Sequence, residues 1–415
     1  MGPLAGGQVR TIVLVWLGWA LLLVGFQGFV QDRFQLVHPD RTLDWTATWT
    51  NGDAASRHPY LQTPILGGHA AWDSEFYISI ALHGYEDPGM KAAAPTSTAD
   101  AEVAGYKKDH PKWVSLNHAF FPGYPLAMSV IARPLAASGM NAVGAATIAG
   151  VIVSLLGALG AMIAIADLAF TQDSADEGDA LRAALYLALW PAAMFMAQVY
   201  SEALFLAFSF GALAFLKRGA WTWAAALAVA AVFTRATGVL LVIPFGLAWL
   251  GGSKGRSAGG ALLALTPAFA YLAWRVLFGA DFDFVETKYF GRYPFDLGAS
   301  WNAWADVFDT LSTGTPLAKS YWWIEFFGTI AGLTTTILLL RRDPPLAFYG
   351  LAIFAVVLTS GAALGMHRYV LSVPALFLVP ATMGRSAAFD RVWSLACSLG
   401  LAVLAISFSF GFWAG

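Results

Sequence analysis

The sequence predicts an all-α polytopic membrane protein, and two observations carry this prediction. Hydrophobic residues make up 58% of the 415 residues and charged residues only 12%, whereas soluble domains contain about 45–50% apolar and about 25% charged residues. The apolar residues also gather in runs that are typical of transmembrane helices. A chain of this composition could not cover its surface with polar groups, which excludes soluble folds, disordered tails and disulfide-stapled secreted domains.

Charge and cysteine content narrow the function classes. The formal net charge is −2, and no basic stripe exists that could follow a nucleic acid. The single cysteine, Cys397, permits neither an intrachain disulfide nor a cysteine-based metal site. His110 and His118 lack local metal-ligand spacing. No cofactor is therefore predicted; a divalent metal is compatible with the sequence, but no motif indicates one.

The chain divides into five regions of a single transmembrane domain. Residues 11–31 predict a retained first transmembrane helix, because no small-residue cleavage pattern follows them. Residues 32–119 form a polar segment with six of the seven histidines and eleven of the 26 acidic residues, and a loop of this length without function is uncommon. Transmembrane helices are expected at 120–280 and 321–415, separated by a second outer loop at 281–320.

The apolar runs predict ten or eleven membrane spans, several of them shorter than the ~20 residues of a straight crossing. Whether residues 120–138 span or lie in the interface is left open; the second alternative lets the later basic loops alternate cleanly. Short basic loops favour the cytoplasm, which places both polar loops outside. The basic clusters lie at Arg10, 217–218, 254–256, 341–342 and 385–391.

The first segment that carries chemistry surrounds Asp73. Within residues 71–85, Phe76, Tyr77, Ile80 and Ala81 follow helical spacing on one face, and Gly84 is placed to end the helix. We therefore expect a short amphipathic helix on the membrane surface, with Asp73 at its start. Asp73 could be an N-cap that receives backbone N–H groups. It could also be a general base at the lipid–water boundary, kept ionised by the helix dipole. The two interpretations are compatible.

Four later segments place polar residues between apolar runs. His118 precedes two prolines and a glycine, which predict a turn into the membrane, and its ring could line a cavity. Glu202 is either solvated in an outer turn or faces a cavity or partner. Arg235 either snorkels, pairs with Glu202 or binds a phosphate. His367 and Arg368 form either an ordinary outer turn or a second cationic contact.

Two weaker signals complete the candidates. The segment 288–294 is basic and aromatic, so Lys288 and Arg292 could touch a phosphate or sugar, although such a stretch is usually an interfacial anchor. The acidic run at 173–179 predicts a solvated loop. On the topology with alternating basic loops, Asp73 and the four later polar segments share one side of the membrane.

The order of these motifs resembles the GT-C membrane glycosyltransferases, and among them the PIG-V type of mannosyltransferase. Trp-Asp-x-x-(Tyr/Phe)-(Tyr/Phe), ending in Gly-Tyr, is matched at 72–85. Ala-Phe-Phe-Pro-x-Tyr-Pro is matched at 119–125, and Pro followed by Tyr-Ser-Glu-x-x-Phe at 191–205. Arg-x-x-Gly is matched at 235–238, and a late Arg-(Phe/Tyr) with a following Pro at 368–374. One departure is the long outer loop between Tyr85 and Asn117, which puts the family's acceptor in doubt.

The resemblance implies a GT-C-like bundle whose large first extracytoplasmic loop carries interfacial helices. It implies inverting transfer of a sugar, with mannose expected, from a polyprenyl- or dolichyl-phosphate donor to a hydroxyl of a lipid, glycan or protein. Asp73 would be the general base and Glu75 its assistant. The residues expected at the donor phosphate or sugar are His118, Tyr200, Glu202, Arg235, His367, Arg368, Lys288 and Arg292.

Competing functions stay open at this point. A related enzyme could use another lipid-linked sugar. From a different class, the chain could be a transporter or lipid flippase, although we detect no internal repeats or paired broken helices, or a non-catalytic assembly subunit. The alanine-rich spans indicate a bacterial member of the family, so we expect an integral protein of the bacterial plasma membrane with its site on the extracytoplasmic face.

Overall fold

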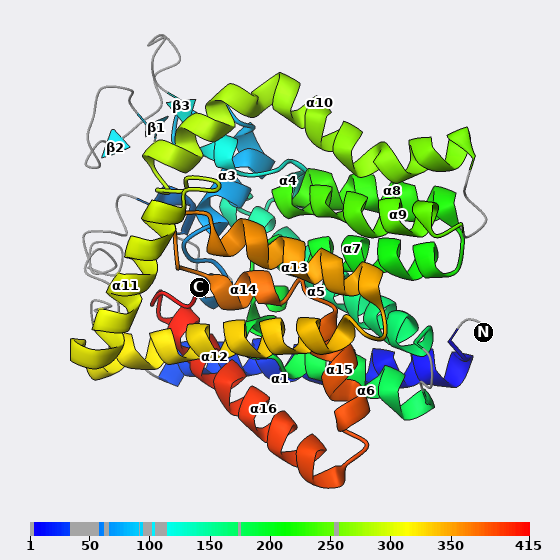
Figure 1. The fold of residues 1–415 in the computed structure, drawn as a ribbon. Helices are drawn as coiled ribbons and strands as arrows, with labels where there is room; N and C mark the ends of the chain where they lie inside the picture. Colours follow the sequence, from blue (N-terminus) through cyan, green and yellow to red (C-terminus); the bar gives the residue numbers. More distant parts are fainter. Residues whose placement is uncertain are drawn as a thin grey trace.

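The computed structural model describes residues 4–33, 58–61, 66–90, 92–93, 102–103, 114–172, 176–252 and 257–415. Helices form most of the described chain (Figure 1), which confirms the all-α prediction. The described residues also include a small antiparallel sheet with the order β2-β1-β3. Its strands are two residues each: β1 (Ala92–Ala93), β2 (Glu102–Val103) and β3 (Val114–Ser115).

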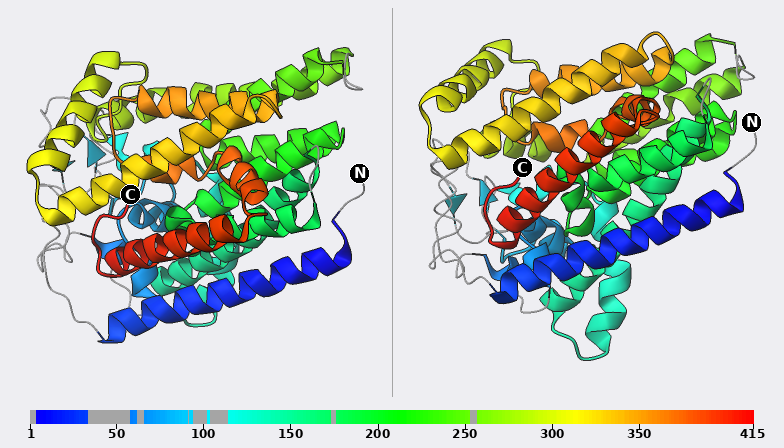
Figure 2. Two further views of the ribbon diagram at one scale, coloured as in Figure 1. Left: turned by 60° about the horizontal axis from the view of Figure 1, so that its bottom comes forward. Right: turned by 90° about the horizontal axis from the view of Figure 1, so that it is seen from below.

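Five described helices are long and apolar enough to cross a membrane, or six if the bent pair Gly178–Leu189 and Pro191–Ala197 counts as one span. They lie side by side in a bundle (Figure 2), as expected of a polytopic membrane protein. The predicted ten or eleven spans would require shorter helices to cross as well, so that number stays a prediction. The five are α1 (Gly6–Arg33), α5 (Ala142–Phe170), α10 (Ala258–Lys288), α12 (Pro316–Leu339) and α16 (Ala387–Ser409).

The remaining helices are shorter, and several of them break where the candidate site residues lie. The region expected as the second outer loop, 281–320, is largely helical, because α10 continues to Lys288 and α11 follows; its side of the membrane stays a prediction. The shorter α-helices are α3 (Ser74–His83), α4 (Gly123–Ala137), α6 (Glu177–Leu189), α7 (Glu202–Lys217), α8 (Trp221–Thr234), α9 (Val242–Leu250), α11 (Leu297–Thr313), α13 (Pro344–Leu358), α14 (Met366–Val370) and α15 (Ala375–Met383). The 3-10 helices are η2 (Pro59–Leu61), η3 (Gly67–His69), η4 (Leu116–Ala119), η5 (Pro191–Ala197) and η6 (Ala236–Leu241).

The described basic loops lie at one end of the bundle, the end at which the described N-terminal residues also lie (Figure 2). Lys217 Nζ is 2.6 Å from Asp343 Oδ2, which joins the α7–α8 turn to the α12–α13 turn. Arg218 of the same turn pairs with Asp167 near the end of α5. α5 therefore ends at the basic end, as expected if residues 120–138 do not cross. The cluster at 254–256 lies outside the described residues.

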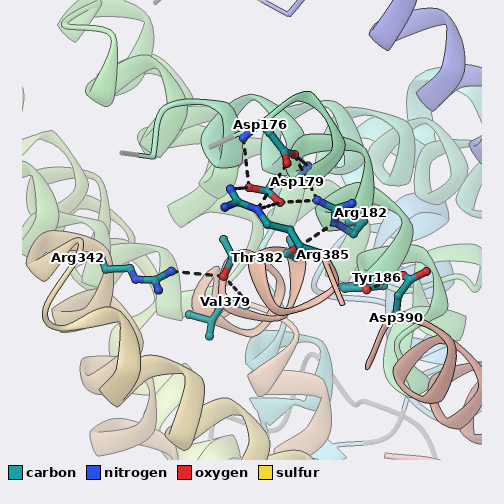
Figure 3. A network of polar contacts seen from close by, with 10 residues as sticks. Asp176, Asp179, Arg182, Tyr186, Arg342, Val379, Thr382, Arg385 and Asp390 are labelled. Carbon is teal, nitrogen blue, oxygen red and sulfur yellow. Dashed lines mark hydrogen bonds and ion pairs between the residues drawn. The ribbon is translucent and has the colours of Figure 1, made fainter. Parts of the chain in front are cut away.

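The acidic run before α6 is not a solvated loop in its described part. Figure 3 shows Asp179 between two arginines of different elements. Its side chain is 2% exposed, lies 2.6 Å from Arg182 Nη2 and also pairs with Arg385. Asp176 and Asp179 form a capping box at the start of α6. A buried carboxylate needs charged or hydrogen-bonding partners. Asp179 has one of them, Arg385, in the turn between α15 and α16, so this ion pair holds α6 against that turn.

Close helix packing brings the other end together. α5 and α7 approach at Gly157, where an added Cβ would lie 2.7 Å from the backbone nitrogen of Leu204. At Gly150 an added Cβ would lie 2.7 Å from the Val199 side chain. Small residues allow such backbone approach between membrane helices. The packing fixes the start of α7, and therefore Glu202, against the middle of α5.

Candidate active site

Asp73 directly precedes α3 but does not cap the helix with its side chain. Its carboxylate makes no capping hydrogen bond, so the N-cap interpretation, with backbone N–H groups bound to the side chain, is wrong. Instead Ser74 Oγ accepts the N–H of Ala71 at 3.1 Å, and the N–H of Asp73 donates to Tyr200 Oη at 3.2 Å. The preceding Trp72 has φ 55°, a left-handed conformation that is rare for a bulky residue. These contacts turn the Asp73 carboxylate away from the helix backbone.

The Asp73 carboxylate meets the other candidate residues through Arg368. Asp73 Oδ2 accepts from Arg368 Nη2 at 3.0 Å. The same nitrogen donates to Glu202 Oε1 at 2.6 Å, and Arg368 Nε donates to that oxygen at 2.9 Å. Arg235 Nη1 lies 2.7 Å from Glu202 Oε1. One oxygen of Glu202 therefore holds two guanidinium groups, and one of these also holds Asp73.

The carboxylates of Asp73 and Glu202 differ in solvent exposure, and this difference limits the role that each can have. The Glu202 side chain is 3% exposed, whereas that of Asp73 is 20% exposed. Asp73 Oδ1 accepts no hydrogen bond from the described residues. Asp73 can therefore meet a reactant that enters the site, while Glu202 is enclosed and fixes the arginines. A buried carboxylate of this kind is stable only when it is paired.

Aromatic rings hold Arg368 from one side. Its guanidinium carbon lies 4.7 Å from the centre of the Phe195 ring and 4.8 Å from that of Tyr200. Such cation–π contacts contribute about 0.5–2 kcal/mol each, more where water is excluded. Tyr200 also donates its hydroxyl to Ala71 O at 3.1 Å. Tyr200 therefore contacts both Arg368 and the backbone around Asp73, although it was expected at the donor itself.

Arg292 joins the cluster through Tyr369. The guanidinium carbons of Arg235 and Arg292 each lie 5.4 Å from the centre of the Tyr369 ring, and Arg292 donates to its hydroxyl. Arg292 Nε is also 3.8 Å from Glu286 Oε2. Lys288 ends α10 and is exposed, and no contact among the described residues links it to the cluster. The segment 288–294 thus contributes one of its two predicted cations.

His367 faces away from Arg368, toward a carboxylate that the sequence interpretation missed. Its Nδ1 is 2.7 Å from Glu325 Oε2, and both side chains are almost fully buried. Glu325 also accepts the backbone N–H groups of Gly365 and His367, each at 2.8 Å. It thereby anchors the start of α14, which carries Arg368. A lone acidic residue within the apolar run 321–340 was the available signal, because such residues are costly in a membrane unless they are paired.

Glu75, which was expected to assist Asp73, contacts a histidine instead. It is buried, and its Oε2 lies 2.6 Å from His58 Nδ1. The following turn of α3 continues this polar layer, because Ser79 donates to Asp87 at 2.6 Å. The expectation that Glu75 acts beside Asp73 finds no support in its contacts, which are those of a structural partner of His58.

A substitution at Glu75 distinguishes these roles. Glu75→Gln replaces a charge-assisted hydrogen bond, worth about 1.5–3 kcal/mol, by a neutral one, worth about 0.5–1.5 kcal/mol, so we expect the free energy of unfolding to fall by about 1–1.5 kcal/mol. Transfer activity per folded molecule is expected to stay near the wild-type value. Denaturation in mixed micelles and a kcat measurement check this. Glu86→Gln, at a carboxylate with a 48% exposed side chain, is the control, and a large loss of kcat by Glu75→Gln alone would restore the assistant role.

His118 lies in a different environment from Asp73. Its ring centre is 5.3 Å from that of Tyr85. Its Nε2 is 3.8 Å from Glu86 Oε1 and from Asp281 Oδ2, and its Nδ1 is 3.2 Å from Ser115 O. None of these partners belongs to the Arg368 cluster. The expectation that His118 reaches the same phosphate is therefore not supported by a contact.

A neutral histidine links the segment before α3 to the segment before α7. His69 Nδ1 is 3.0 Å from Ala197 O, and Val199 N donates to His69 O at 2.9 Å. Burial lowers the pKa of His69 to about 4, so the ring is uncharged at neutral pH. The pair of contacts sets η3 against η5 and therefore Asp73 against Tyr200. Among the residues described, no group of three or more His, Cys, Asp or Glu is placed to hold a metal ion.

The fold and this cluster define an integral membrane protein with an aspartate and several arginines gathered between helix ends. Comparison with known proteins gives the family it resembles. Residues 106–250 match the model of the family described as Mannosyltransferase (PIG-V), which confirms the resemblance stated from the motifs. The matched region contains His118, Tyr200, Glu202 and Arg235, whereas Asp73 and the later arginines lie outside it.

The curated relatives match about half of this chain, whereas the solved structures match almost all of it. GPI alpha-1,6-mannosyltransferase 2 of Mus musculus is 31% identical over 214 residues, which are 51% of this chain and 36% of that protein. The Homo sapiens protein of that name is 32% identical over 179 residues, 42% of this chain and 29% of that protein. The chain thus covers only about a third of these relatives' length.

Two solved membrane enzymes resemble the fold at low sequence identity. The oligosaccharyltransferase AglB of Archaeoglobus fulgidus, solved with an inhibitory peptide and a dolichol-phosphate, has a TM-score of 0.46 at 13% identity, over 96% of this chain and 56% of that chain. ArnT of Cupriavidus metallidurans, bound to undecaprenyl phosphate, has a TM-score of 0.43 at 14% identity, over 94% of this chain and 71% of that chain.

Proposed function

We propose that this protein is a membrane mannosyltransferase that uses a polyprenyl-phosphate-linked mannose as donor and a hydroxyl group as acceptor. The observation that carries the proposal is the partly exposed Asp73 carboxylate, held 3.0 Å from an arginine of a buried arginine–glutamate cluster. The match to the PIG-V family supports the choice of sugar. A base beside phosphate-binding cations is what such a transfer needs.

The reaction is a single displacement with inversion. Asp73 accepts the proton of the acceptor hydroxyl while its oxygen bonds to the anomeric carbon of the donor. The bond from that carbon to the phosphate oxygen breaks, and the electron pair leaves with the polyprenyl phosphate. Arg235 and Arg368 hold the phosphate as its charge grows, and guanidinium groups suit phosphate because their N–H donors form a planar fork.

The shared arginine couples donor binding to the base. In the described arrangement Arg368 Nη2 is held by Asp73 and Glu202 together. A donor phosphate that takes over this nitrogen frees Asp73 Oδ2 to receive a proton. Glu202 stays bound to Arg368 Nε and to Arg235, so the arginines remain in place. Donor binding therefore frees the second oxygen of Asp73, in addition to Oδ1, to accept the proton of the acceptor hydroxyl.

The proposed site faces the extracytoplasmic side of the membrane. The cluster lies at the opposite end of α7 from the basic turn at Lys217–Arg218, and basic turns favour the cytoplasm. A lipid-linked sugar has its phosphate at the interface and its tail in hydrocarbon. A site between short helices near one end of the bundle suits that geometry. We propose a bacterial plasma membrane as the location.

The test is a reconstituted assay. Purified protein in liposomes receives labelled polyprenyl-phosphate-mannose, the matching glucose and pentose donors, and GDP-mannose, each with a panel of lipid, glycan and peptide acceptors. We expect transfer from the mannose lipid alone, with inversion at the anomeric carbon. Transfer from GDP-mannose, or movement of the intact donor between leaflets without transfer, would contradict the proposal and favour a nucleotide-sugar enzyme or a flippase.

Arg235 gives a second test of the donor site. Arg235→Gln removes a charge-assisted hydrogen bond worth about 1.5–3 kcal/mol, so we expect kcat/KM for the donor to fall roughly 10–150-fold. Kinetics at varied donor concentration measure the loss. Arg275→Gln, which breaks an exposed ion pair with Asp283, should leave these constants unchanged. Unchanged kinetics of Arg235→Gln would exclude a contact between Arg235 and the phosphate.

A further inference from the structure

Residues 410–415 turn back from α16 into the candidate site. The turn begins where Gly411 N donates to Phe408 O and Phe412 N donates to Ser407 O, both at 2.9 Å. Ala414 is 1% exposed and Gly415 is also buried. We call residues 412–415 the clamp segment. Its contacts reach both sides of the ion pair between Asp73 and Arg368.

On one side the clamp segment holds the residue before Asp73. The Trp413 ring packs edge-on against Trp72, with ring centres 5.0 Å apart and planes at 89°. Trp72 Nε1 donates to Phe412 O at 3.4 Å. The left-handed φ of 55° at Trp72 persists only if surrounding contacts over-determine it. The clamp segment supplies two of these contacts, so it helps set the direction of the Asp73 backbone.

On the other side the clamp segment holds Arg368. Gly415 O accepts from Arg368 Nη1 at 2.8 Å. Nε and Nη2 of Arg368 already contact Glu202 and Asp73. The oxygen of Gly415 therefore binds the remaining guanidinium nitrogen, Nη1. An added Cβ on Gly415 would lie 2.7 Å from Arg368 Cδ. It would also lie 2.9 Å from Cε1 and Nε2 of His367, so the packing is too tight for any side chain here unless Arg368 and His367 both move.

A buried polar chain connects the clamp segment to α14. Trp413 Nε1 donates to Tyr321 Oη at 2.8 Å, and Tyr321 donates to Glu325. Glu325 in turn accepts the backbone N–H groups at the start of α14. Trp413 thus contacts Trp72 directly and is joined through two hydrogen-bonded side chains to the helix that carries Arg368.

We propose that Trp413 and Gly415 are positioning residues of the site, which set the Asp73 backbone and the Arg368 guanidinium relative to each other. The kinetic consequence rests on the proposed transfer reaction; the positioning itself does not. Neither residue meets the donor in this proposal. They act through Trp72 and Arg368, so their loss should affect the rate of chemistry more than the amount of folded protein.

The first measurement follows Arg368 without any need for transfer. Purified protein is treated with phenylglyoxal, and modification at each arginine is followed by peptide mass spectrometry, with exposed Arg341 as internal reference. In Gly415→Ala we expect the rate at Arg368 to rise roughly fivefold, as for the loss of one net hydrogen bond. Gly25→Ala is the control, because a Cβ there meets nothing within 4 Å.

The second measurement is steady-state transfer. Trp413→Ala and Gly415→Ala should lower kcat at least tenfold, whereas Trp413→Phe should regain most of it, because its ring still packs on Trp72. Trp223→Ala, at a 67% exposed tryptophan, should leave kcat unchanged. Wild-type modification rates at Arg368 in both Gly415→Ala and Trp413→Ala would overturn the proposal. A raised rate in a protein whose wild type transfers no sugar would support positioning and refute the proposed function.

Discussion

Asp73→Asn is expected to lower kcat for mannosyl transfer by roughly 10²–10⁴-fold, because an amide cannot accept the acceptor's proton and general bases contribute about that much. The donor KM should change little, since Arg235 and Arg368 remain paired with Glu202. Folding should survive, because the Asp73 side chain makes no capping hydrogen bond that Asn would have to replace. Reconstituted transfer kinetics and the melting temperature of the same preparation measure the two effects separately.

A matched substitution controls for the loss of one carboxylate. Asp306→Asn lies at an exposed position of α11 and should transfer at the wild-type rate. If Asp73→Asn keeps the wild-type kcat while it folds normally, Asp73 is not the base. The remaining partly exposed carboxylate beside Arg292, that of Glu286, would then be the next residue to substitute.

Glu202→Ala is expected to destabilise the fold by about 3–5 kcal/mol. The substitution leaves Arg235 and Arg368 without their shared carboxylate, and breaking a buried pair by removing one partner has this order of cost. Unfolding in mixed micelles of increasing denaturing detergent measures the free energy, and the expressed amount should fall with it.

Two further variants, one at this position and one at an exposed ion pair, separate the effect of burial from that of charge. Glu202→Gln keeps an oxygen for the arginines and should lose less stability than Glu202→Ala. Asp283→Ala breaks the exposed pair with Arg275 and should cost at most ~1 kcal/mol, as surface pairs do. If Glu202→Ala lowers the free energy of unfolding no more than Asp283→Ala does, the pairing of Glu202 with Arg235 and Arg368 does not stabilise the fold.

The sequence predicts the membrane class and four members of the cluster because those signals are local. Composition alone requires burial of most side chains in an apolar phase. Asp73, Glu202, Arg235 and Arg368 each interrupt or border an apolar run, where an unpaired charge is costly. Such residues are therefore expected to find one another, and the structure brings these four together. Their catalytic roles remain proposals.

Other features depend on contacts that no local pattern reports. Glu75 lies within a matched motif and His118 directly before one, yet their partners are His58, Glu86 and Asp281, which come from separate segments. The side on which Asp73 presents its carboxylate depends on the unusual backbone of Trp72. Propensity and hydrophobic pattern carry no information on such a conformation, which tertiary contacts impose.

The contacts that residues 410–415 make with the site could not be predicted from sequence patterns either. Residues 410–415 contain no charged side chain, and their hydrogen bonds to Arg368 and His367 are made by backbone oxygens. A backbone acceptor is present at every position of a chain, so its use at Gly415 has no compositional signature. Only the structure shows why residue 415 has to be small, because an added Cβ there would lie against Arg368.

The most direct test of the central claim is an experimental structure of Asp73→Asn with polyprenyl-phosphate-mannose bound in a lipid nanodisc. We predict the phosphate within hydrogen-bond distance of the Arg235 and Arg368 guanidinium groups, with the substituted side chain at position 73 facing the anomeric carbon across the space for an acceptor hydroxyl. A donor whose phosphate lies at the basic end of the bundle, or whose sugar is turned away from position 73, would contradict the mechanism.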